Sequence, residues 1–247
     1  MYSWKAIRAV CLVLLLLPIV HLVYLVSRDT MAVLDTSPEA WRGELEDYAR
    51  EDSNNHLPED PIVVVGGQRV KLWRDLPDLL APRPVLMRGL GDATINDITF
   101  NYQRLVGYYR PDTVVFLPSN SEFHIRDNKS GEDLYRAIAE FVALDADHGI
   151  TRRIYVITPI KTPLYPGDDG PIDQATTLLE SWAADEERVE ILDVNAMLSN
   201  GGGRPKPEYF RSDGVNLNES GYLRLSLLLQ ARIEQEELDS MQHTASR

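Results

Sequence analysis

From residue 61 onward the chain contains five short runs of apolar, mostly β-branched residues. Of all the features of the sequence, this pattern places the strongest restriction on the fold. The runs are almost continuously apolar, which is typical of strands that are covered on both faces of a parallel sheet. Segments with helical spacing separate them, and strands that alternate with helices build a three-layer α/β/α sandwich. We therefore expect a five-stranded parallel sheet with strands at 62–65, 84–87, 113–117, 153–158 and 189–193.

Two of the intervening segments predict helices clearly. Residues 131–146 place Leu134, Ile138 and Phe141 on a single helix face. The last helix is expected to begin at Asn218, because asparagine is a favoured helix cap. In open α/β sheets ligands bind outside the carboxyl ends of the strands. The loops after the strands, together with the loop before the last helix, are therefore where a site is expected.

An uncharged stretch, residues 9–26, precedes this region and is long enough to cross a bilayer as a helix. Lys5 and Arg8 lie before it, which favours a cytoplasmic N-terminus. The alternative is a cleaved signal peptide, but its apolar region is normally shorter and ends in an A-x-A-like site, which residues 27–33 lack. We expect residues 1–28 to be a single-pass inner-membrane anchor that carries a periplasmic or otherwise extracytoplasmic domain.

The rest of the chain divides into three parts. Residues 29–60 form an acidic connector, with a short amphipathic helix over 38–50 that either packs on the domain's flank or docks a membrane partner. Residues 61–235 form the main domain, and residues 236–247 a polar C-terminal tail. The formal net charge of −13 repels nucleic acid, so no nucleic-acid partner is expected.

Four segments fall, in chain order, at the expected strand ends and before the last helix. They are 65–73 (VGGQRVKLW), 85–94 (VLMRGLGDAT), 116–121 (FLPSNS) and 210–222 (FRSDGVNLNESGY). Together they resemble the four sequence blocks of the SGNH/GDSL hydrolases, a superfamily of lipases and acylhydrolases, over about residues 61–235. The resemblance implies the three-layer α/β/α fold of that superfamily.

The departures from the family pattern concern the catalytic positions. Gln68 stands where the family has its nucleophilic serine, and Asn216 stands where it has its histidine. A carboxamide neither forms an acyl-enzyme nor takes up a proton near neutral pH. Asn120 keeps an oxyanion-hole donor, but Asp92 replaces the oxyanion-hole glycine, and its carboxylate would repel a developing oxyanion. Asp213 keeps the orienting acid, whose remaining role is to accept hydrogen bonds from backbone amides of its own loop.

These losses imply a pseudoenzyme that serves as a binding module or as an accessory subunit of an envelope or membrane complex. Its pocket would be lined by Gln68, Asp92, Asn120, Asp213 and Asn216, whose amides and carboxylates suit a polyhydroxylated or acylated glycan. Alternatively, these groups satisfy one another and the pocket is closed. No cofactor is expected, and the two acids lack a recognised metal-ligand spacing.

An active esterase or acylhydrolase with a relocated nucleophile is the competing hypothesis. Ser121 with His124 as its base would then act just after the third strand. Turn serines and a surface histidine are the ordinary interpretation of the same residues. Nearby, the loop 159–170 contains three prolines and two glycines, which suits either a rim over the pocket or a passive surface loop.

Overall fold

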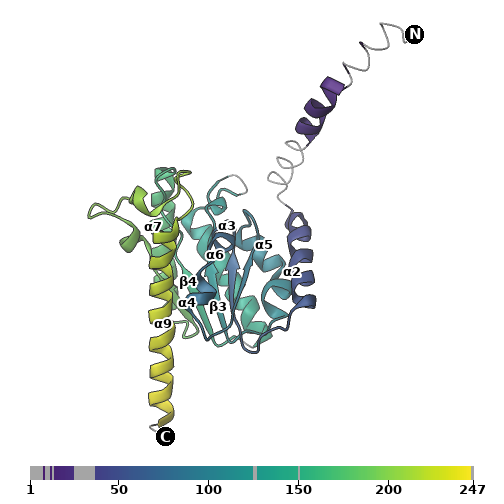
Figure 1. Ribbon diagram of the computed structural model, residues 1–247. Helices are drawn as coiled ribbons and strands as arrows, with labels where there is room; N and C mark the ends of the chain where they lie inside the picture. The colour runs from purple at the N-terminus through teal and green to yellow at the C-terminus, as the bar shows by residue number, and fades with distance from the viewer. Residues whose placement is uncertain are drawn as a thin grey trace.

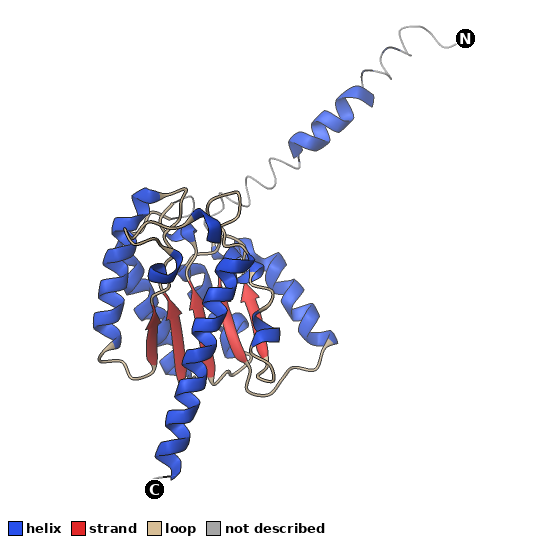
Figure 2. Cartoon of the chain, turned by 60° about the vertical axis from the view of Figure 1, so that its left-hand side comes forward, coloured by secondary structure: helices blue, strands red, loops and turns tan. Residues whose placement is uncertain are grey.

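The computed structural model describes residues 8, 12, 14–24, 37–124, 127–149 and 151–245. A five-stranded, fully parallel sheet in the order β2-β1-β3-β4-β5 forms the centre of the domain (Figure 2). The predicted sheet is thus confirmed, and the strand bounds differ from the expected ones by one or two residues. The strands are β1 (Ile62–Gly66), β2 (Val85–Gly89), β3 (Thr113–Leu117), β4 (Arg153–Ile157) and β5 (Val189–Leu192).

Helices cover both faces of the sheet, which confirms the three-layer α/β/α sandwich (Figure 1). One face carries α2 (Arg42–Asn54), α5 (Ile95–Phe100), the π-helical η2 (Gln103–Gly107), α6 (Gly131–His148) and α7 (Asp169–Ala183). The other face carries α3 (Gln68–Leu72), α4 (Leu76–Leu79), α8 (Asn195–Leu198) and α9 (Glu219–Ala245). Four short 3₁₀ helices complete the described elements: η1 (Pro38–Trp41), η3 (Asn120–Glu122), η4 (Pro166–Asp168) and η5 (Pro207–Tyr209).

The apolar strand residues divide between two cores because successive side chains of a strand point to opposite faces. In β1, Val63 and Val65 belong to the core beneath α5 and α6, whereas Val64 packs beneath α3 and α9. All three are fully buried, and each such side chain contributes about 1.5–3 kcal/mol of hydrophobic stabilisation. Burial on both faces explains why the internal strand β1 contains only apolar residues.

Local signals fix the ends of the two longest helices. Before α6, Ser130 and Asp133 form a capping box, in which each side chain accepts a hydrogen bond from the other residue's backbone N–H. Gly149 ends this helix in the left-handed conformation, with φ of 65°. Asn218 caps α9, since its Oδ1 accepts the backbone N–H of Gly221 at 3.0 Å.

Helix α9 continues through residues 236–245, across the boundary at which the sequence pattern separated a C-terminal tail from the domain. Glutamate, glutamine, leucine and methionine are good helix formers, and the sequence contains no glycine or proline after Gly221 to end the helix. The helix therefore extends beyond the sheet, as Figures 1 and 2 show. Its distal part leaves Leu238 and Met241 exposed.

The predicted anchor, residues 9–26, lies partly outside the described residues. Residues 14–24 are helical, and their apolar side chains, such as Leu15, are largely exposed. Within the part of the chain that the structure describes, no helix combines the length and the apolar character needed to span a membrane.

Helix α2, in the connector, packs on the flank of the domain. Its Asp52 forms an ion pair with Arg88 of β2 at 2.6 Å, and both side chains are more than nine-tenths buried. The Arg88 guanidinium lies between the rings of Tyr48 and Tyr109, 4.8 Å from each centroid. Tyr109 also donates a hydrogen bond to Asp52 at 2.5 Å. Since these polar groups satisfy one another in the interior, they fix the helix to the edge of the sheet.

The ends of β1 and β3 approach each other closely at Gly66. This residue has φ of 151°, and a Cβ atom there would lie only 2.2 Å from the carbonyl oxygen of Leu117. Only glycine combines that backbone conformation with so close a contact.

We predict that Gly66→Ala lowers the free energy of unfolding by at least about 2 kcal/mol, because β1 and β3 must separate to admit the methyl group. Urea denaturation followed by circular dichroism measures this change. Gly43→Ala is the matched control, since a Cβ at that α2 position meets nothing within 4 Å. The control should change stability by less than about 1 kcal/mol, and equal effects of the two variants would contradict the prediction.

Candidate functional site

The strand order reverses between β1 and β3, so the loops that follow these two strands run to opposite sides of the sheet. In a parallel sheet, this reversal leaves a crevice at the carboxyl ends of the strands. The crevice holds a pocket of about 220 Å³. All seven side chains singled out in the sequence line it: Gln68, Asp92, Asn120, Ser121, His124, Asp213 and Asn216.

The first wall of the pocket follows β1. Gln68 is the first residue of α3, directly after the tight turn at Gly66 and Gly67. A Cβ at Gly67 would lie 2.8 Å from that of Ser119, so the loops after β1 and β3 are in direct contact. Arg69, the next residue of α3, also lines the pocket and is only 3 % exposed. The sequence pattern did not single out Arg69, because it occupies a variable position of the first block.

The late loop supplies a second wall, which is joined to the first by the hydrogen bond from Arg69 to the carbonyl oxygen of Val215. Asp213 accepts hydrogen bonds from the backbone amides of Val215 and Asn216 at 2.8 and 2.9 Å, the role expected of it. Its second oxygen accepts the side-chain Nδ2 of Asn216 at 2.9 Å. Partial burial acts to raise the pKa of Asp213, but these hydrogen bonds outweigh it and hold the pKa below its usual value. The carboxamide of Asn216 is therefore held in place by the acid that precedes it.

The loop after β3 begins with the 3₁₀ turn η3. Ser119 caps this turn, because its Oγ accepts the backbone N–H of Ser121 at 3.2 Å. The hydroxyl of Ser119 also donates a hydrogen bond to that of Ser121, at 3.2 Å. Asn120 is 9 % exposed, and its Oδ1 accepts no hydrogen bond from the described residues. The pocket wall thus contains a buried acceptor that the described part of the chain leaves unsatisfied.

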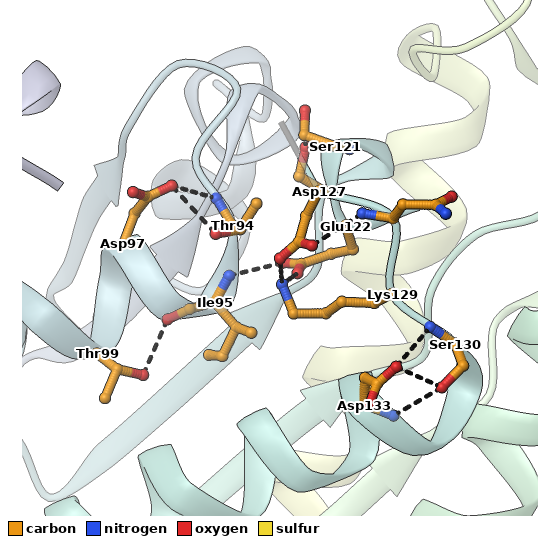
Figure 3. A network of polar contacts seen from close by, with 12 residues as sticks. Thr94, Ile95, Asp97, Thr99, Ser121, Glu122, Asp127, Lys129, Ser130 and Asp133 are labelled. Carbon is orange, nitrogen blue, oxygen red and sulfur yellow. Dashed lines mark hydrogen bonds and ion pairs between the residues drawn. The ribbon is translucent and has the colours of Figure 1, made fainter. Parts of the chain in front are cut away.

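Glu122 ties this loop to Ile95, as Figure 3 shows. Its fully buried carboxylate accepts the backbone N–H of Ile95, at the start of α5, at 2.6 Å and forms an ion pair with Lys129 at 3.0 Å. Burial raises the pKa of Glu122 to about 7, against the opposing effects of Lys129 and the amide of Ile95. Sequence reasoning missed Glu122, because no motif marks it and its partners come from other segments.

His124 connects the pocket to the loop 159–170. Its Nδ1 lies 3.2 Å from Oδ2 of Asp168, and its ring packs on Tyr165 with centroids 4.0 Å apart. Leu164 and Tyr165 line the pocket, so this loop forms a rim of the site. Burial raises the pKa of Asp168, while His124 acts in the opposite direction. The histidine is thus engaged with the rim loop.

The polar side chains that line the pocket are placed to donate and accept hydrogen bonds. Among the described residues, no hydrogen bond joins Ser121 to His124, although both line the same pocket. The same residues include no group of three or more His, Cys, Asp or Glu side chains placed to hold a metal ion. Carboxamides occupy the two positions at which the family resemblance places a nucleophile and a base.

Comparisons with solved structures find the same architecture in known proteins. A protein assigned as an acylhydrolase from Bacteroides fragilis has a TM-score of 0.66 and 20 % identity, covering 77 % of this chain and 96 % of that one. A GDSL-like lipase from Bacteroides thetaiotaomicron has a TM-score of 0.65 and 18 % identity, covering 78 % and 98 %. An acetylxylan esterase from Geobacillus stearothermophilus has a TM-score of 0.55 and 13 % identity, covering 71 % and 94 %.

The fold and the strand-order reversal define an α/β protein of the doubly wound type, with a pocket at the carboxyl ends of β1 and β3. More particularly, the chain has the fold of the SGNH/GDSL hydrolases, since its structural neighbours are GDSL-like lipases and acylhydrolases that it covers almost completely. Comparisons of the sequence with family models and with curated proteins give no match.

We predict that Asp213→Asn removes a pH dependence of stability at low pH. Because the folded-state pKa is depressed below the usual 3.8, the charged carboxylate stabilises the fold above that pH, and the contribution is lost as the pH falls through the folded-state pKa. The difference in unfolding midpoint between wild type and variant should therefore be constant above about pH 5 and shrink below about pH 4.

Thermal unfolding at several pH values, followed by circular dichroism, provides the measurement. Asp185→Asn is the matched control, because Asp185 is exposed and its carboxylate accepts no hydrogen bond from the described residues. A difference between wild type and Asp213→Asn that is the same at every pH would contradict the assignment.

Proposed function

We propose that the protein is a non-catalytic binding domain built on the SGNH/GDSL hydrolase fold. One observation carries the proposal. The positions that correspond to the family's serine and histidine, Gln68 and Asn216, line a pocket of about 220 Å³ rather than filling it. An unfilled polar pocket favours ligand binding over the alternative in which its groups satisfy one another.

The proposed loss of catalysis follows from chemistry. In the family the serine attacks an ester carbonyl while the histidine takes its proton. Neither Gln68 nor Asn216 performs its half of that step, since an amide is neither a nucleophile nor a base at neutral pH. In triad enzymes, removing one or both of these groups costs about a million-fold in rate. Even intact remaining groups would leave this mechanism without useful activity.

The ligand class follows from the lining of the pocket. Amides, hydroxyls and carboxylates surround a small volume, below the ~300–1,000 Å³ of sites for drug-sized molecules. A sugar unit of a polyhydroxylated or acylated glycan suits such walls. The acetylxylan esterase among the structural neighbours acts on an acylated glycan by its name, which supports this class for the present pocket.

We also propose that residues 1–28 anchor the domain to the inner membrane, with the N-terminus cytoplasmic and the pocket outside. The uncharged run at 9–26 and the preceding Lys5 and Arg8 support this orientation. In that setting the domain would serve as an accessory subunit of an envelope or membrane complex.

The competing function is an esterase with Ser121 as a relocated nucleophile. One observation favours it: His124 lies in the same pocket and contacts Asp168 through Nδ1, as a catalytic histidine contacts its acid. Against it, the Ser121 hydroxyl pairs with Ser119, and no hydrogen bond joins it to His124 among the residues described. The non-catalytic function therefore remains the better supported of the two.

We expect the full-length protein neither to react with a fluorophosphonate probe nor to hydrolyse short acyl esters such as p-nitrophenyl acetate. In-gel fluorescence and absorbance report the two reactions, with an active GDSL esterase as the positive control. Ser121→Ala and its neighbour Ser119→Ala form a matched pair. Labelling that Ser121→Ala abolishes and Ser119→Ala preserves would overturn the non-catalytic proposal and establish the relocated esterase.

We expect the full-length protein to remain in the membrane fraction after alkaline carbonate washing, because a spanning helix resists extraction. In mild detergent it should run at a mass above that of a monomer and its detergent micelle, as a subunit of a complex would. Light scattering coupled to gel filtration measures that mass. A mature protein that begins after residue 28 and is released by the wash contradicts the anchor, and a strictly monomeric species contradicts the accessory role.

A further inference from the structure

Among the described residues, two arginines are almost completely buried, and they differ in whether a carboxylate contacts the guanidinium. Arg69 and Arg88 are each 3 % exposed. Arg88 has a carboxylate partner, Asp52, at 2.6 Å, and two tyrosine rings around its guanidinium. A buried cation normally has such a partner, because an uncompensated charge is costly in the interior.

Arg69 has no such partner. Its Nη2 donates one hydrogen bond, to the carbonyl oxygen of Val215 at 2.9 Å, and its buried Nε has no acceptor among the described residues. No carboxylate of the described chain lies within 4.0 Å of its guanidinium. Asp213 is a nearby acid that acts on Arg69, but its two oxygens already accept three N–H groups from Val215 and Asn216.

The surroundings of Arg69 have a further consequence for its charge. Burial lowers the pKa of Arg69 to about 10, although Tyr222 and Asp213 act in the opposite direction. The guanidinium therefore stays positively charged at neutral pH, and the free-energy cost of burying its charge remains. An anion beside the guanidinium would reduce that cost, since charges interact more strongly where water is excluded. Asp92 and Asp213 also line the pocket and repel an anion, so the anionic group of a ligand must lie against Arg69 and away from these two acids.

A second unsatisfied polar group in the pocket further restricts the chemical class of the ligand. The Oδ1 of Asn120 is buried and accepts no hydrogen bond from the described residues, so a ligand that completes the site would bring a donor, such as a hydroxyl, as well as an anion. We propose that the pocket binds a small hydroxylated carboxylate, a sugar acid, and that Arg69 selects its charge. This inference rests on the proposed binding function and specifies the ligand class.

Three monosaccharides test the proposal: D-glucuronate, its neutral amide D-glucuronamide, and D-glucose. They share one ring and differ at a single carbon, so their affinities for the full-length, detergent-solubilised protein isolate the effect of the carboxylate. Isothermal titration calorimetry should show that glucuronate binds at least about tenfold more tightly than either neutral sugar, as expected for a charge-assisted hydrogen bond.

Arg69→Gln should reduce this preference to less than about twofold, because the cation is gone. Arg74→Gln is the matched control, since Arg74 is exposed beyond the end of α3 and does not line the pocket; it should preserve the preference. Circular dichroism shows whether each variant is folded. If Arg69→Gln does not fold, the comparison of glucuronate with glucuronamide on the wild-type protein decides the question.

The outcomes separate this inference from the proposed function. Equal affinities for glucuronate and the neutral sugars would overturn the role of Arg69 and leave a neutral-glycan pocket standing. A preference for glucuronate that Arg69→Gln leaves unchanged would also overturn it. Failure of all three sugars to bind would count against both the sugar-acid ligand and the glycan-binding function.

Discussion

The contact between the ends of β1 and β3 is the constraint on which the rest of the site depends. Gly66 admits the carbonyl of Leu117 where any side chain would collide with it, and the two strands diverge into separate loops directly afterwards. Gln68 and Ser119 are placed by that divergence, and the late loop before α9 lines the same pocket. A pocket arises here because two neighbouring strands end together while their connections leave in opposite directions.

Polar ties between loops then hold the walls of this pocket. Glu122 joins the loop after β3 to the start of α5, Asp213 fixes Asn216, and His124 holds the rim through Asp168. Such cross-connections limit the movement of the lining side chains before any ligand arrives. Preorganisation of this kind reduces the entropy lost on binding, and it serves a receptor as well as it serves an enzyme.

The sequence predicts the sheet and the location of the pocket because both depend on local patterns. Strands buried on two faces are nearly uniformly apolar, and the four blocks fall at their ends. The ion pair of Glu122 with Lys129 and the lack of a carboxylate in direct contact with Arg69 among the described residues depend instead on which segments meet in space, and no local pattern records that. Helix α9 also continues past residue 235, where the sequence pattern placed the end of the domain. The polar composition after residue 235 suggested a tail, but this segment contains no residue that stops a helix.

The attachment of α2 has a mechanical consequence. Its buried Asp52–Arg88 pair, enclosed by Tyr48 and Tyr109, joins the helix to β2 at the edge of the sheet. The described chain therefore begins with helices that are fixed to the sheet by a buried ion pair. Tension applied at the N-terminal side would pass along α2 into β2 and its neighbour β1, the strand that leads to Gln68. A force applied to the start of α2 would thus reach the pocket through the Asp52–Arg88 pair and the hydrogen-bonded strands β2 and β1.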